Sequence, residues 1–260
     1  MALDSKLKAG AYLVKSYVTA MPRVIYRATF SLMFDPKGTQ KFVHQILNAQ
    51  DIETDDPILG SRDITELMNG GGDIQITGPY YARRSSDTRL LMELACLAYL
   101  AQNLHPKLIF EIGTFVGRTT RLLAVNIAPN SQIVTLDLPQ EQVKQDIGVD
   151  YRNTTEASRI RQVYGDSRFY DFSAWHGKCD FVWVDACHDY DFVVSDTRNA
   201  LNMCRPGGWI GWHDYRHTAW WSGVTRAVRE LRFEYPGLRH VRGTTMALLK
   251  KPEKEDKRNE

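Results

Sequence analysis

The stretch from Leu108 to Thr120 constrains the fold more than any other part of the chain. It begins with four apolar residues among five, a run typical of a parallel strand that is covered on both faces. Gly113 follows this run, and Gly117 precedes a segment with helical apolar spacing that Pro129 stops. Glycines permit positive φ and close approach of a ligand, and the first N–H groups of a helix favour electron-rich groups. The stretch therefore predicts a strand, a glycine turn and a helix that together bind a ligand.

The spacing of the glycines separates two classes of cofactor. A dinucleotide turn needs G-x-G-x-x-G, and Phe115 occupies the place of the middle glycine. The Glu-x-Gly-x-x-x-Gly-x-Thr series instead resembles the first motif of class I S-adenosylmethionine-dependent methyltransferases. This resemblance implies S-adenosyl-L-methionine as the cofactor and a strand-end acid near its amino group, and it places these residues at the cofactor: Glu111, Gly113, Thr114, Gly117 and Thr119. The alternative is an ordinary turn whose glycines serve only packing.

Length and composition are those of a globular α/β protein. The 260 residues can bury one sizeable core with an appendage, so we expect one catalytic domain and an extension. A net charge of +2 argues against strong nucleic-acid binding. The four cysteines form no C-x-x-C pair, which indicates reduced thiols. Because no apolar run approaches the roughly 18 residues of a membrane span and no clear signal-peptide pattern is present, we expect a cytoplasmic protein.

The first 34 residues carry five basic side chains against one acidic side chain, interleaved with apolar residues. This pattern predicts one or two basic amphipathic helices, broken near Pro22. Such helices can pack on the catalytic domain, form a homo-oligomer contact or lie at the periphery of an anionic membrane, and we expect one of the first two. Gly70–Gly72 is a break in the chain. We therefore predict a helical extension over 1–72, a methyltransferase domain over 73–252 and a charged tail over 253–260.

The whole pattern predicts a Rossmann-like, seven-stranded and mostly parallel sheet with helices on both faces.

Acidic residues end or follow the second and third predicted strands. Asp137 ends the second strand, where an acid can accept hydrogen bonds from both ribose hydroxyls, although a solvent-facing aspartate is the alternative. Gly165, Asp166 and Ser167 follow the third strand. In the methyltransferases that the chain resembles, this tripeptide meets the adenine, with Asp166 at the exocyclic amine.

The candidate chemistry lies after the fourth and fifth strands. Asp185 and His188 leave the fourth, and we expect them in the same crevice as the cofactor acids because ligands bind at the carboxyl ends of parallel strands. From Phe110 to Tyr215 the chain resembles small-molecule and sugar O-methyltransferases of natural-product and glycan biosynthesis. The resemblance to the catechol-type and macrolide-sugar enzymes implies His188 as the general base and Asp185 as a residue of both the cofactor site and the metal site. It implies these metal ligands: Asp185, His213 and Asp214.

His213 departs from that pattern, because a carboxylate is usual at its position. Imidazole suits Zn²⁺, Mn²⁺ or Fe²⁺ better than Mg²⁺, so the metal stays open among these four. A metal-free enzyme would keep His188 as the only base, with Asp185 or Asp214 orienting it. If neither histidine is catalytic, His188 and His213 are helix-cap or strand-end residues with a structural role. A non-catalytic cofactor-binding module and a nicotinamide oxidoreductase are the other function classes. The expected acceptor is a hydroxyl of a small molecule or of a sugar or glycan precursor, with no nucleic-acid partner.

Overall fold

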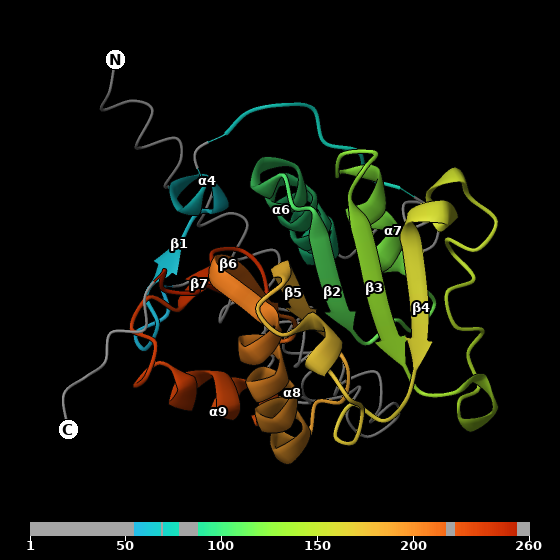
Figure 1. Cartoon of the computed structure of the whole chain (residues 1–260). Coiled ribbons are helices and arrows are strands. Elements are labelled where there is room, and N and C mark those ends of the chain that lie inside the picture. Colours follow the sequence, from blue (N-terminus) through green and yellow to red (C-terminus); the bar gives the residue numbers. More distant parts are fainter. Residues whose placement is uncertain (1–54, 69, 78–87, 217–221, 254–260) are drawn as a thin grey trace, which may run out of the picture. The chain divides into compact units, whose positions relative to one another are not determined.

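The computed structural model describes residues 55–68, 70–77, 88–216 and 222–253. The chain divides into two compact units, 1–50 and 51–260, and all of the described residues belong to the second (Figure 1). The predicted basic helices and most of the predicted extension over 1–72 therefore lie outside the described residues. None of the described helices is long and apolar enough to cross a membrane.

The described part of the chain forms one mixed sheet of eight strands. The strands are β1 Ser61–Arg62, β2 Leu108–Ile112, β3 Gln132–Asp137, β4 Ile160–Tyr164, β5 Cys179–Val184, β6 Cys204–Trp212, β7 Arg239–Val241 and β8 Ala247–Lys250. Their order is β1-β7-β8-β6-β5-β2-β3-β4, and only β8 runs antiparallel to its neighbours, β6 and β7. The predicted α/β fold with a mostly parallel sheet is confirmed.

The helices lie between the strands in the chain. They are α4 Ile64–Leu67, α6 Thr88–Leu104, α7 Arg118–Val125, α8 Tyr190–Met203 and α9 Ser222–Leu231, with short 3₁₀ turns η1 Gln140–Gln142, η2 Thr155–Arg159 and η3 Ser173–Trp175. Helices α6 and α7 cover one face of the sheet, and α8 and α9 cover the other (Figure 1). Because the central strands run parallel to one another, their carboxyl ends lie at the same end of the sheet.

Two hydrophobic cores explain why the central strands read as continuous apolar runs. In β2, Ile109 belongs to the core beneath α6 and α7, whereas the next residue, Phe110, belongs to the core beneath α8 and α9. Both side chains are completely buried. Successive residues of a strand point to opposite faces, so a strand that is covered on both faces needs apolar residues at consecutive positions.

The sheet contains one strand more than the seven predicted. Strand β1 is only two residues long, which is too short for an alternation of apolar and polar residues that would predict a strand from the sequence. It pairs in parallel with β7, where Ser61 lies opposite His240, and the Ser61 Oγ is 2.8 Å from the His240 Nδ1. Strand β6 begins at Cys204, ahead of its apolar stretch at Trp209, because Cys204 already pairs with Cys179 of β5.

Candidate active site

A cavity of about 610 Å³ lies at the carboxyl ends of β2, β3, β4, β5 and β6. Its wall includes ten of the residues that the sequence predicts for the cofactor, the base or the metal: Gly113, Thr114, Thr119, Asp137, Asp166, Ser167, Asp185, His188, His213 and Asp214. The predicted cofactor residues Glu111 and Gly117 do not line it. The rule that ligands bind at strand ends thus brings together residues that follow or end five strands.

Two glycines shape the turn after β2 in different ways. Gly113 has φ of 105°, and a Cβ there would lie 2.1 Å from the carbonyl oxygen of Asp185, so no side chain fits between the exits of β2 and β5. Gly117 is the N-cap of α7 with φ of 82°, and a Cβ there would lie 2.5 Å from the ring of Tyr151. Gly113 therefore lets the exits of β2 and β5 approach each other closely, whereas Gly117 lets α7 begin against Tyr151.

Glu111 lies behind the turn, with no exposed surface. Its Oε2 accepts hydrogen bonds from the hydroxyls of Thr120 at 2.5 Å and Thr135 at 2.6 Å, so the carboxylate joins β2 to α7 and β3. Burial raises the pKa of Glu111 to about 8, which outweighs the opposing effect of the two hydroxyls. The structure places this acid in a supporting position beneath the cavity wall.

Asp137 connects the glycine turn to the end of β3. Its Oδ2 accepts the N–H of Phe115 at 2.6 Å, and its Oδ1 accepts the N–H of Leu138 at 2.7 Å. Phe115 has a φ of 51°, the left-handed conformation that a non-glycine residue rarely adopts. Each carboxylate oxygen has more than one acceptor position, so Asp137 keeps the capacity to bind ribose hydroxyls in the cavity.

The predicted adenine region contains an arginine and an aromatic ring that we did not predict. The carboxylate of Asp166 accepts hydrogen bonds from the Arg168 Nη2 at 3.0 Å and the Arg168 backbone N–H at 2.9 Å. These bonds hold the pKa of Asp166 below its usual value. The Arg168 guanidinium lies 3.9 Å from the ring centre of Phe192, a cavity residue on α8. Apolar residues on a helix usually belong to a core, so the sequence carried no signal that would select Phe192.

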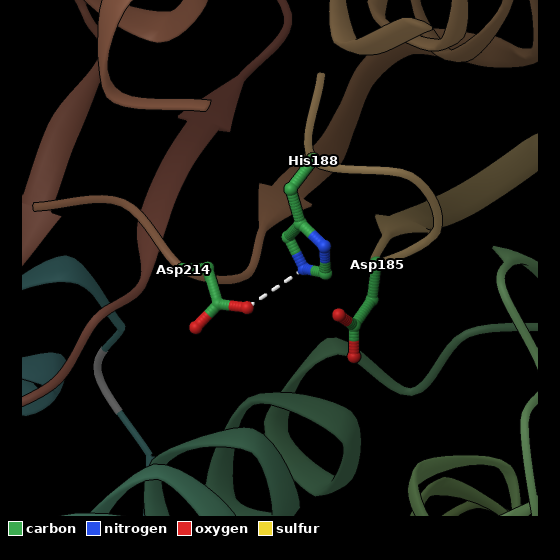
Figure 2. Close-up of side chains that lie close together, drawn as sticks. All are labelled: Asp185, His188 and Asp214. Carbon is green, nitrogen blue, oxygen red and sulfur yellow. Dashed lines mark ion pairs between the residues drawn. The ribbon is translucent and has the colours of Figure 1, made fainter. Parts of the chain in front are cut away.

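A histidine and two aspartates converge where β5 and β6 end. The Nε2 of His188 lies 2.8 Å from the Oδ2 of Asp214 (Figure 2). Asp185 lies beside them, and the three residues offer ligand atoms that are all within 4.8 Å of one another. Figure 2 shows that the second ring nitrogen of His188 points away from Asp214. Two carboxylates and an imidazole in this arrangement fit either proton transfer or a divalent cation.

His213 lies beside this convergent set, among carboxylates. Its Nδ1 is 3.2 Å from both the Asp185 Oδ1 and the Asp214 Oδ2, and its Nε2 is 3.3 Å from the Glu93 Oε2. Burial disfavours the charged ring, but Asp185 and Asp214 outweigh burial and hold the pKa of His213 well above its usual value. The ligand atoms that converge belong to Asp185, His188 and Asp214. The set predicted from the sequence has His213 in place of His188.

Glu93, on α6, is the main site residue that sequence reasoning missed. It is 8% exposed, and its Oε1 accepts both the backbone N–H and the hydroxyl of Thr245 at 2.5 Å. Burial alone would raise its pKa, but the contacts with His213 and Thr245 lower it. A readable signal existed in the sequence, because Glu93 stands three after Leu90 and four before Leu97, the spacing of one face of a helix. An acid on a core-facing stripe needs a buried partner.

Parts of this chain are similar in sequence to known proteins. Residues 110–215 match the family model described as a methyltransferase domain. Caffeoyl-CoA O-methyltransferase 2 from Petunia hybrida is 23% identical over 138 residues, which are 49% of this chain and 52% of that protein. The chain thus spans about half the length of this curated relative.

Two solved structures share the fold over most of the described chain. An O-methyltransferase from Bacillus cereus in complex with SAH has a TM-score of 0.50 at 19% identity, covering 80% of this chain and 100% of that one. The O-methyltransferase TomG from Streptomyces achromogenes, in complex with SAM, has a TM-score of 0.51 at 16% identity, covering 80% and 98%. The predicted resemblance is supported: residues 110–215 of this chain carry a methyltransferase domain, and its fold is that of these solved O-methyltransferases.

Proposed function

We propose that this protein transfers the methyl group of S-adenosylmethionine to a hydroxyl of a small molecule or of a sugar or glycan precursor. The observation that carries the proposal is the convergence of Asp185, His188 and Asp214 in the wall of the cavity that the glycine turn also lines. The names of the relatives, each an O-methyltransferase, favour oxygen as the accepting atom.

The cofactor would occupy the 610 Å³ cavity. Asp137 would bind the ribose, and Asp166 and Ser167 would meet the adenine, with the ring of Phe192 beside it. The cofactor supplies an electrophilic methyl group. The protein has to hold the acceptor oxygen in line with that group and remove the hydroxyl proton, because a neutral alcohol is a weak nucleophile.

His188 is the group that we assign to the proton. Its Nε2 faces the Asp214 Oδ2 at 2.8 Å, so a proton on Nε2 is shared with that carboxylate and the acceptor proton is taken at Nδ1. Asp214 orients the ring and stabilises the imidazolium that forms. A positioned base of this kind contributes roughly 10² to 10⁴-fold to the rate.

The charge of the cluster supports a divalent cation as well. Three carboxylates, those of Asp185, Asp214 and Glu93, meet two imidazoles, those of His188 and His213, so the carboxylates outnumber the possible positive charges. Mn²⁺, Fe²⁺, Zn²⁺ or Mg²⁺ would be held by Asp185 and Asp214, and it would acidify the acceptor hydroxyl. Two roles are open for His188 when a metal is bound. It either remains the general base, or it is the third metal ligand beside Asp185 and Asp214.

Methyl transfer from a labelled donor to a panel of metabolites and nucleotide sugars tests the proposal. We expect a labelled product whose methyl group is on oxygen, and we expect His188→Gln to form it roughly 10² to 10⁴-fold more slowly. If the protein binds the cofactor but labels no acceptor in any extract, with and without added Mn²⁺, the chain is a cofactor-binding module and the proposed activity is wrong.

A further inference from the structure

A second cavity, of about 520 Å³, lies beside α9, and arginines dominate its wall. Arg226 and Arg229 are on α9 and Arg232 follows its last residue, with Glu230 as the only acid in the lining. The volume is within the usual range of small-molecule sites. No residue of this wall belongs to the wall of the cavity at the glycine turn.

One arginine of this cavity is neutralised by the acid. The Arg226 Nε lies 3.0 Å from the Glu230 Oε1, and the other oxygen of Glu230 accepts a hydrogen bond from the Tyr190 hydroxyl at 2.5 Å. The partners of Glu230 are thus Arg226 and Tyr190, and it forms no ion pair with the other two arginines of the cavity.

Arg229 and Arg232 are held by neutral oxygens. The Arg229 Nε donates to the Tyr215 hydroxyl at 3.4 Å, and the Arg232 Nη1 donates to the carbonyl of Ile58 at 3.0 Å. In the ranges that the structure covers, no carboxylate forms an ion pair with either guanidinium. Asp56, behind the Tyr215 hydroxyl, is buried and does not line the cavity. Two partly buried positive charges therefore face this space without a counter-charge.

The remaining wall suits an organic anion. A guanidinium presents five N–H donors in a planar fork, and each of these two arginines uses one nitrogen for its anchor, so further N–H groups are left for oxygens of a phosphate. Thr225 accepts the Arg216 N–H at 3.0 Å and still has its hydroxyl proton to donate. Phe233, 69% exposed, provides an apolar surface on the rim.

We propose that this cavity binds a phosphorylated small molecule. Arg229 and Arg232 bind the phosphate oxygens, the Thr225 hydroxyl donates to one of them, and the apolar part of the ligand lies on Phe233. The proposal does not depend on methyl transfer, because it rests on residues outside the active-site cavity.

Calorimetric titration of the full chain with inorganic pyrophosphate tests the assignment. We expect saturable binding that Arg229→Gln weakens roughly 10 to 100-fold, the usual effect of losing hydrogen bonds to a charged group. Arg239→Gln is the matched control, because the Arg239 guanidinium also donates to backbone carbonyls, of Pro236 and Leu238, but lies outside this wall. The control should bind pyrophosphate like the unchanged protein.

Three further measurements keep the result decisive. SAH should bind with the same affinity in the presence of saturating pyrophosphate, and competition would place pyrophosphate in the cofactor cavity and overturn the proposal. Succinate should bind more weakly than pyrophosphate, and equal binding would overturn the assignment to phosphate. If Arg229→Gln does not fold, Arg229→Lys, which keeps the charge but loses the fork, should weaken binding. Equal pyrophosphate affinity in the folded variant and the unchanged protein would also reject the site.

Discussion

His188 and Asp214 leave different strands, yet the His188 Nε2 lies 2.8 Å from the Asp214 Oδ2. The contact exists because β5 and β6 are parallel neighbours, paired from Cys179–Cys204 to Val184–Trp212, so that the segments after their ends meet. Asp214 has a φ of 57°, and this left-handed conformation turns the chain immediately after β6. At this distance Asp214 can orient the imidazole of His188, the proposed base.

Replacing the base should separate chemistry from cofactor binding. We expect His188→Gln to lower turnover roughly 10² to 10⁴-fold and to leave SAH affinity unchanged, because the imidazole acts on the acceptor proton. Steady-state kinetics and calorimetry measure the two effects. His176→Gln, an exposed histidine outside the cavity, is the control. Undiminished turnover in His188→Gln would remove this residue from the mechanism.

Metal removal should distinguish the two roles of His188. We expect chelator-treated protein to lose activity and to regain it with Mn²⁺, because carboxylate charge predominates in the cluster, and Asp214→Ala should abolish the recovery. Direct titration with Mn²⁺ then assigns His188: unchanged metal affinity in His188→Gln identifies a base, and weakened affinity identifies a ligand. Full activity of metal-stripped protein would leave only the metal-free version.

Asp137 should control cofactor affinity. Asp137→Ala removes the expected acceptor for the ribose hydroxyls and also the acceptor of the Phe115 N–H at 2.6 Å, which supports the turn. We expect SAH to bind roughly 10 to 100-fold more weakly, measured by calorimetry. Asp146→Ala, which changes an exposed acid outside the cavity wall, should have no effect. Unaltered affinity in Asp137→Ala would show that the ribose assignment is wrong.

Glu111 should make stability depend on pH. Its pKa is raised from about 4.5 to about 8 in the folded protein, so the folded state binds more protons than the unfolded state between these values. The contribution of Glu111 to the free energy of unfolding therefore falls as pH rises through this window. Relative to Glu111→Gln, the unchanged protein should lose up to a few kcal/mol between pH 5 and pH 8, measured by urea unfolding. A pH-independent difference would contradict the raised pKa.

Glu93 should act on stability and on the catalytic cluster. Glu93→Ala leaves the Thr245 N–H without its acceptor and His213 without one of its carboxylates, at a cost of about 3 kcal/mol in the free energy of unfolding. Glu93→Gln keeps a carbonyl oxygen for Thr245 and should be considerably more stable than Glu93→Ala. We expect Glu93→Gln to lower turnover while SAH affinity is retained. Equal stability of the two variants would show that the Thr245 contact is unimportant.

The fold could be predicted where local pattern and topology agree. The apolar run of β2 and the glycine turn after it identify the central βα unit, and the strand-end rule then places Asp185 and Asp214 at one cavity. Contacts that depend on three elements at once escape such reasoning. Glu93 reaches His213 only because α6, the end of β6 and the segment before β8 meet, and one sequence does not encode that meeting in any short pattern.

The short β1 strand determines how far the chain can be shortened. A fragment that begins at residue 73, the predicted domain boundary, would lose both β1 and Asp56. Loss of β1 would expose the backbone N–H and C=O groups of β7 at an unpaired sheet edge, and such edges promote edge-to-edge aggregation. Loss of Asp56 would remove the acceptor, at 2.5 Å, of the buried Tyr215 hydroxyl, one residue after Asp214. The described residues ahead of the glycine break thus cover a sheet edge and hold the Tyr215 hydroxyl next to the proposed catalytic cluster.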